Sequence, residues 1–207
     1  MISIDAYFVR ERDVREMQTV SIFMTKYDDI LSNFVYLISG LGYTHVAICF
    51  DEETQDYYTF NYKGFRREHP FGNRRRYGKS IRFELQVPKE QHTSLKEMIR
   101  QMENSQIEWK YSLWGVVLCI LGIRHKFKGS YFCSQFVAEL LEKSGIIKWK
   151  KHPSLYLPNQ MCRELSSHIG LKSMTLFQSI EKVPVIEEQE ISRIEMKEDD
   201  NQKIKIE

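Results

Sequence analysis

The stretch YFCSQFVAELL, residues 131–141, has the pattern of a helix that packs one face against a core. Its small and apolar residues recur at i, i+3, i+4, i+7 and i+8, the inward stripe of an α-helix: Cys133, Phe136, Val137, Leu140 and Leu141. The preceding residues KGS supply a turn and a possible N-cap at Ser130. We therefore expect Cys133 in the first turn of this helix, facing the core.

Two interpretations of Cys133 follow from this position. Free cysteine is among the residue types most often buried and packs like a small hydrophobic residue, so the stripe alone indicates a core position. In the first turn of a helix, however, unpaired backbone N–H groups and the positive end of the helix dipole stabilise a thiolate. The same N–H groups can hold the oxyanion of a tetrahedral intermediate. The residues of this stretch leave both interpretations open.

A nucleophilic cysteine needs a general base, and the pattern favours His45 for that role. The stretch YTHVAICFD, residues 43–51, alternates with period two and predicts a strand with His45, Ala47 and Cys49 on one face. The two small side chains on that face would let a helix pack closely against it. A histidine on a half-exposed strand without a catalytic role would show the same pattern.

Two further histidines remain as reserves for the base. His69 and His152 lie in predicted loops, where each could approach a cysteine on a neighbouring helix. The other three histidines lie in loops or at polar helical positions that do not favour catalysis: His92, His125 and His168.

The third residue of a catalytic triad would hold the imidazole in place, and Asn61 is the candidate. The stretch DYYTFNYKG predicts a hairpin partner for the histidine strand. In one register His45 faces Asn61, whose amide oxygen could accept the imidazole N–H. In a register shifted by one residue, Phe60 faces His45, and a dyad or a more distant residue would be required. Asn61 would then be a polar residue at a strand end.

The rest of the chain predicts an α+β domain over residues 1–181, in which a small antiparallel sheet or partial barrel packs against the cysteine helix. We expect strands at 1–10, 20–28 and 80–88, helices at 28–40, 89–104, 112–123 and 160–168, and a long basic loop at 63–80. Residues 112–123 are too short to cross a bilayer and predict a buried helix, either plain core or the wall of an apolar pocket. Residues 182–207 predict a charged, extended or disordered tail.

The composition is that of one sizeable domain with a tail. The 207 residues are 42% hydrophobic and carry a net charge of +2, which gives no reason to expect a nucleic-acid partner. The basic cluster RRRYGK, residues 74–79, is typical of a solvated loop. The N-terminus lacks a signal-peptide profile, so we expect a cytoplasmic protein. The four cysteines show no metal-binding spacing, and we expect no metal, disulfide or cofactor.

The histidine strand, followed about 90 residues later by YFCSQFVAELLEKSG, resembles the NlpC-like papain-fold cysteine hydrolases. The histidine precedes the cysteine, which is the order of the circularly permuted branch that includes YiiX-like bacterial proteins and lecithin retinol acyltransferase relatives. The resemblance covers residues 20–160 and implies Cys133 as nucleophile and His45 as base. It places a third polar residue near Asn61, where no acidic residue stands, so either Asn61 substitutes or the triad is incomplete.

The resemblance implies acyl transfer: the thiolate attacks an amide or ester carbonyl, His45 protonates the leaving group, and water or another acceptor then releases the acyl group from the thioester. We expect a bacterial or phage cysteine amidase or peptidase that acts on a small peptide, amide or acylated lipid-like substrate. A lipid-directed acyltransferase or esterase of the same fold is the alternative enzyme. A catalytically weak binding module, with residues 74–79 or the tail as its contact surface, is the alternative outside enzymes.

Overall fold

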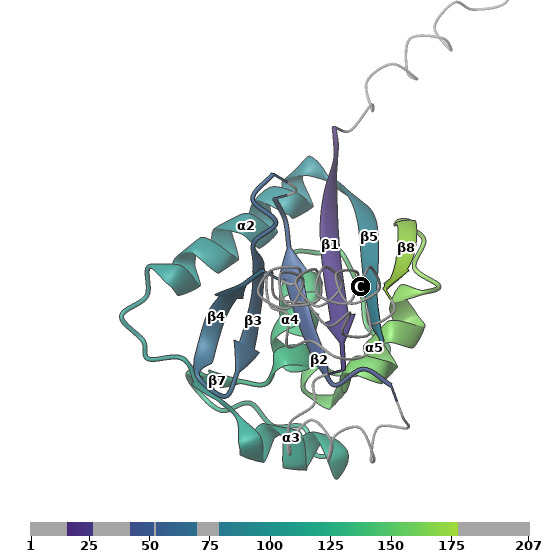
Figure 1. The fold of residues 1–207 in the computed structure, drawn as a ribbon. Helices are drawn as coiled ribbons and strands as arrows, with labels where there is room; N and C mark the ends of the chain where they lie inside the picture. The colour runs from purple at the N-terminus through teal and green to yellow at the C-terminus, as the bar shows by residue number, and fades with distance from the viewer. Residues whose placement is uncertain (1–15, 27–41, 52, 70–78, 178–207) are drawn as a thin grey trace, which may run out of the picture.

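A six-stranded antiparallel sheet organises the protein in the computed structural model, which describes residues 16–26, 42–51, 53–69 and 79–177. The strands follow the order β4-β3-β2-β1-β5-β8, which runs from left to right in Figure 1. Their bounds are β1 (Met17–Thr25), β2 (His45–Cys49), β3 (Tyr57–Asn61), β4 (Gly64–Glu68), β5 (Ser80–Pro88) and β8 (Leu171–Phe177).

Four α-helices and a second, two-stranded sheet complete the described part of the chain. The helices are α2 (Lys89–Glu103), α3 (Leu113–Ile120), α4 (Cys133–Lys143) and α5 (Pro158–Leu165), with a 3₁₀ turn η2 (Pro153–Leu155). Strands β6 (Lys110–Tyr111) and β7 (Ser130–Tyr131) pair in parallel. The fold class is therefore α+β, as the sequence predicts.

The main core lies between one face of the sheet and the helices α2, α4 and α5. Strand β5 shows why: it alternates, with Ile81, Phe83 and Leu85 buried and the residues between them less so. Helix α4 packs on the Val46 and Ile48 side of β2 and lies behind the sheet in Figure 1. Helix α4 is part of this core, because every residue of its predicted inward face, from Cys133 to Leu141, is buried.

Several predictions about elements are confirmed. The strand predicted at 20–28 is β1, the two hairpin strands are β2 and β3, and the helices predicted at 89–104 and 160–168 are α2 and α5. The strand predicted at 80–88 is β5. The predicted strand 1–10, helix 28–40, tail 182–207 and most of the basic cluster 74–79 lie outside the described residues.

Four predictions are wrong, each for a physical reason. The predicted loop 63–80 contains β4, because Gly64 at φ +86° closes a tight turn that returns the chain along β3. Ser130 belongs to β7 and does not cap α4. The helix packs on the opposite face of β2 from Ala47 and Cys49, which instead join a cluster with Phe23 and Tyr57.

The fourth correction concerns α3, which was expected to be buried. Only Gly115, Val116 and Cys119 of this helix are buried. Leu113, Trp114 and Val117 are exposed. The helix lies between β6 and β7 in the chain, and within the described residues its packed side meets Phe132 and Leu157. Figure 1 shows it at the lower end of the molecule, beyond the edge of the sheet.

Candidate active site

Cys133 is the first residue of α4, as the sequence predicts. Phe132 before it is extended, with φ −103° and ψ 162°, and no side chain caps the helix. The backbone N–H groups of the first turn therefore have no cap from a neighbouring side chain, which is the arrangement in which a helix N-terminus can stabilise an anion. The residue itself is buried, with 4% of its surface exposed.

His45 is the first residue of β2 and is likewise buried, with 4% exposed. Its imidazole lies near enough to Cys133 for the two side chains to interact electrostatically. The two residues lie 88 positions apart in the sequence, and the elements that carry them, α4 and β2, are neighbours in the fold. The structure thus brings together the two residues that the sequence pattern singled out.

The other side of the imidazole faces Glu68, at the end of β4. His45 Nε2 lies 3.3 Å from Glu68 Oε2 and 3.4 Å from Thr59 Oγ1. The Thr59 hydroxyl donates its proton to the Val46 carbonyl, at 2.7 Å, so toward His45 it can only accept. Nε2 therefore carries a proton, and Glu68 holds it in place.

Asn61 contacts this carboxylate. Its Nδ2 donates to Glu68 Oε1 at 3.0 Å, and its Oδ1 accepts from the Lys63 backbone at 2.9 Å. The β2–β3 pairing of Ile48 with Tyr58, followed three steps along each strand, has the register that places Asn61 opposite His45. The asparagine thus lies where the hairpin pattern predicts, but the group that meets the imidazole is Glu68.

The pKa of His45 is raised from 6.5 to about 9. Burial alone would lower it, because a charged imidazolium is poorly solvated in a core. The interactions with Cys133 and Glu68, including the negative charge that each can carry, outweigh burial. At neutral pH the imidazole is therefore protonated, with a carboxylate on one side and the sulfur on the other.

The two reserve histidines are engaged elsewhere. His69 pairs with Asp56 at 3.2 Å and has a largely exposed side chain. His152 Nδ1 lies 2.8 Å from the Ser154 hydroxyl and accepts from the Ser154 backbone, which caps η2. These contacts give each of them a local structural role.

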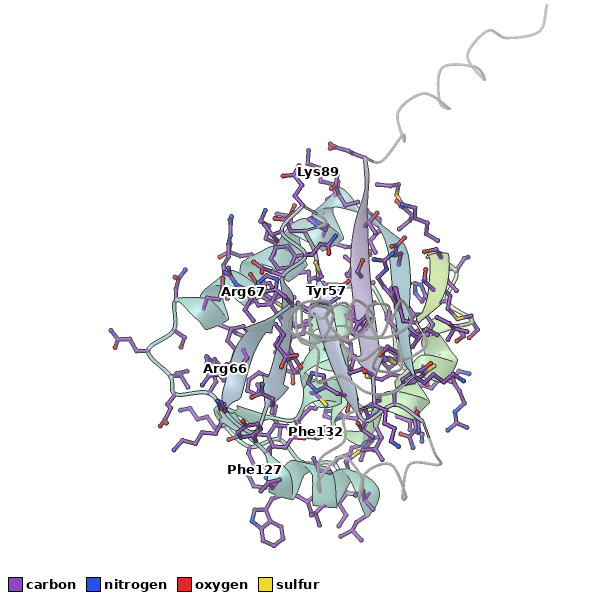
Figure 2. The ribbon with its side chains drawn as sticks, viewed as in Figure 1. Tyr57, Arg66, Arg67, Lys89, Phe127 and Phe132 are labelled. Atoms are coloured by element: carbon purple, nitrogen blue, oxygen red, sulfur yellow. The ribbon has the colours of Figure 1, made fainter. Side chains whose placement is uncertain are left out.

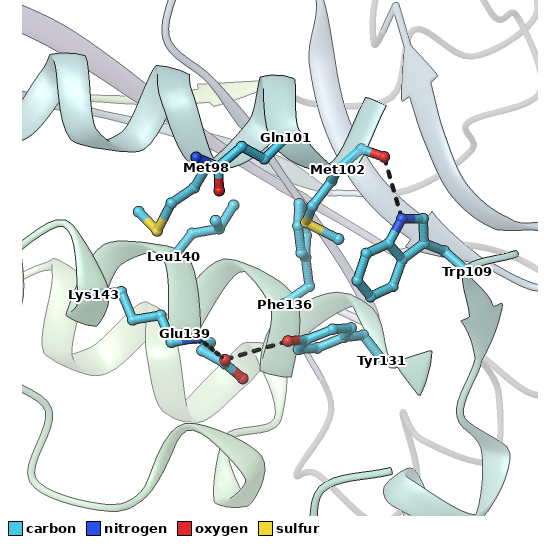
Figure 3. A pocket seen from close by; sticks show the side chains of 9 residues that line it. All are labelled: Met98, Gln101, Met102, Trp109, Tyr131, Phe136, Glu139, Leu140 and Lys143. Carbon is cyan, nitrogen blue, oxygen red and sulfur yellow. Dashed lines mark hydrogen bonds and ion pairs between the residues drawn. The ribbon is translucent and has the colours of Figure 1, made fainter. Parts of the chain in front are cut away.

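Two hollows in the described surface lie away from Cys133 and His45. The first, of about 230 Å³, lies between α2 and α4. In Figure 3, Met98 and Met102 reach down from α2 toward Phe136 and Leu140 of α4, while Tyr131 bonds to Glu139 at the rim. The second lies along β4 and β6. Neither of these two hollows is lined by Cys133 or His45.

Glu68 is the site residue that sequence reasoning did not find. The pattern of residues 63–80 predicts a loop, whereas Glu68 lies on β4, one hairpin beyond Asn61. The signal was the turn NYKG followed by GFRRE, which can form a second hairpin when Gly64 takes a positive φ.

No family model matches the chain, and no curated protein is detectably similar to it in sequence. Within the described ranges, no group of three or more His, Cys, Asp or Glu side chains could hold a metal ion. The helices that the structure describes are all too short or too polar to cross a membrane.

Proposed function

We propose that this protein is a cysteine hydrolase with a circularly permuted papain-like fold, in which Cys133, His45 and Glu68 form the catalytic triad. The observation that carries the proposal is the buried His45, placed between a cysteine at a helix N-terminus and a carboxylate. A thiol, an imidazole and an acid in series are the groups that thiol-dependent acyl transfer requires.

Each group has a defined task in this proposal. Glu68 holds the proton on Nε2 and thereby fixes the orientation of the ring. The other nitrogen, Nδ1, is then the one that exchanges a proton with the sulfur. Asn61 is a positioning residue, because it holds the carboxylate of Glu68 and does not touch the reacting atoms. These assignments revise the triad expected from the sequence in its third member only.

The reaction proceeds in two steps. The Cys133 thiolate attacks the carbonyl carbon of an amide or ester, and the C–N or C–O bond breaks as His45 gives its proton to the departing amine or alcohol. The resulting thioester is hydrolysed when neutral His45 takes a proton from water, whose oxygen adds to the carbonyl and expels the thiolate. The Cys133 backbone N–H would stabilise the oxyanion in both steps.

The fold supports the same proposal. A histidine strand inside an antiparallel sheet, followed later in the chain by a cysteine helix that packs against it, is the order expected of the permuted branch. A lipid-directed esterase or acyltransferase is a second candidate, because apolar α3 lies beside the site: Cys119 of α3 is near enough to interact electrostatically with Cys133. If no acyl-enzyme forms, the protein would instead be a binding module without turnover.

The test is the capture of an acyl-enzyme. Incubation with a p-nitrophenyl ester should release p-nitrophenol and leave an acyl group that peptide mass spectrometry locates on Cys133. The adduct should be absent from Cys133→Ala and unaffected in Cys162→Ala, a matched control on α5. No adduct on the wild-type protein, or an adduct that survives Cys133→Ala, would contradict the proposal.

A further inference from the structure

Helix α3 presents an apolar face to solvent that the proposed catalytic site does not use. The exposed fraction is 70% for Trp114, 64% for Leu121 and 57% for Leu113. Val117 and Ile123 are exposed beside them. Single exposed apolar residues are ordinary, but five within the eleven positions 113–123, including a tryptophan, are a cluster of the kind found at interaction sites.

Helix α3 is capped at its N-terminus and packs against the rest of the protein along one side. Ser112 Oγ accepts from the Gly115 backbone at the N-terminus of the helix. On the inner side, Val116 and Cys119 pack against Phe132 and Leu157. Phe132 and the nearby Phe127 lie at this lower end of the molecule (Figure 2). These contacts hold α3 in place, so its exposed apolar side chains belong to a packed helix.

The surroundings of α3 are basic. No acidic residue occurs from 109 to 138 or from 143 to 163. Arg124 and Lys128 follow the helix, and neither forms an ion pair within the described part of the chain, whereas Lys126 pairs with Glu139. Lys151 also lies near the helix: burial raises the pKa of Cys119, and the charge of Lys151 opposes that rise. An exposed apolar helix is therefore bordered by positive charge.

We propose that α3 and its basic border dock this protein onto the surface of an anionic lipid bilayer. Apolar side chains and tryptophan enter the boundary between headgroups and acyl chains, while lysine and arginine meet the anionic headgroups. A second copy of the chain fits less well, because symmetric pairing through α3 would bring two like-charged borders together. The proposal does not depend on the hydrolase activity.

The test is flotation of the full chain with two kinds of vesicle, phosphatidylcholine alone and phosphatidylcholine mixed with phosphatidylglycerol. Binding should require the anionic lipid and weaken as salt increases. Trp114→Ser should weaken it roughly ten-fold, because one large apolar contact is lost. Lys128→Gln should weaken it about five-fold. Both side chains are exposed, so neither change disturbs the core.

Ile169→Ser is the matched control, since Ile169 is fully exposed outside α3, just before β8, and its substitution should leave vesicle binding unchanged. Failure of the wild-type protein to float with anionic vesicles would overturn the proposal. So would binding that Trp114→Ser leaves intact. Sedimentation of the wild-type protein as a dimer that Trp114→Ser dissociates would assign the face to a second copy instead.

Discussion

Cys133 and Cys119 lie on neighbouring short helices and are buried to similar extents, with 4% and 7% exposed. Their surroundings differ. Cys119, on the inner side of α3, packs among Val116, Phe132 and Leu157, and burial raises its pKa to about 12. Cys133 meets a histidine that a carboxylate holds in place.

The contrast shows that neither burial nor a helical position identifies a reactive cysteine. An apolar surrounding keeps a thiol protonated and inert, whereas an adjacent imidazolium provides the counter-charge for a thiolate. The feature that separates the two cysteines is therefore the buried His45 beside Cys133, which Glu68 contacts on its other side. Substitutions of His45, Glu68 and Asn61 should reduce the reactivity of Cys133. The effect should be largest for His45 and smallest for Asn61.

Removal of the imidazole should have the largest effect. In His45→Gln, Cys133 loses both its counter-charge and its proton donor and should resemble Cys119. Ester hydrolysis should fall by about 10² to 10⁴-fold, the usual contribution of a general acid–base group. Steady-state release of p-nitrophenol measures it. The matched control is His69→Gln, whose exposed side chain lies in an ion pair at the sheet edge and should leave the rate unchanged. Equal rates for wild type and His45→Gln would contradict the triad.

Neutralising the acid should have an intermediate effect. Glu68→Gln keeps an oxygen that can accept the Nε2 proton but removes the negative charge, so the pKa of His45 should fall below its value of about 9. The imidazolium should then lose its proton at lower pH than in the wild type. An NMR titration of the His45 ring measures this shift, and turnover should fall roughly ten-fold. A His45 pKa that does not move would show that Glu68 is only a neighbour.

Loss of the positioning residue should have the smallest effect. Asn61→Ala removes the hydrogen bond to the Glu68 carboxylate and the one from the Lys63 backbone N–H, but leaves the contact between Glu68 and His45 in place. Turnover should fall only a few-fold, and the free energy of unfolding by about 1 kcal/mol. Urea unfolding and the same ester assay measure the two effects. A loss as large as that of His45→Gln would instead place Asn61 among the groups that act on the imidazole.

The sequence predicts the elements around the site because local patterns determine them. The stripe from Cys133 and the alternation from Thr44 to Phe50 specify a helix and a strand whatever surrounds them. The β2–β3 register does not follow in this way, because the sequence lets His45 face either Asn61 or Phe60. The observed pairing of Ile48 with Tyr58 gives the register in which Asn61 lies opposite His45.

Features that depend on tertiary neighbours could not be predicted in this way. The pattern of β4 is weak because basic residues interrupt it, so the strand that carries Glu68 resembles a loop. The exposure of α3 is not visible in its composition, because an apolar helix that projects from the fold has the same residues as one inside it. The face of β2 that α4 covers depends on packing across the whole sheet.

The most direct measurement is competitive alkylation of the native protein with limiting iodoacetamide at neutral pH, with the modified cysteines identified by peptide mass spectrometry. Accessibility alone favours Cys162, which is only partly buried, over Cys133. Activation by His45 predicts the reverse order: Cys133 should react on the order of a hundred-fold faster than Cys162 and lose that lead in His45→Gln. Faster labelling of Cys162 in the wild-type protein, or labelling of Cys133 that His45→Gln leaves unchanged, would contradict the central claim that His45 activates this thiol.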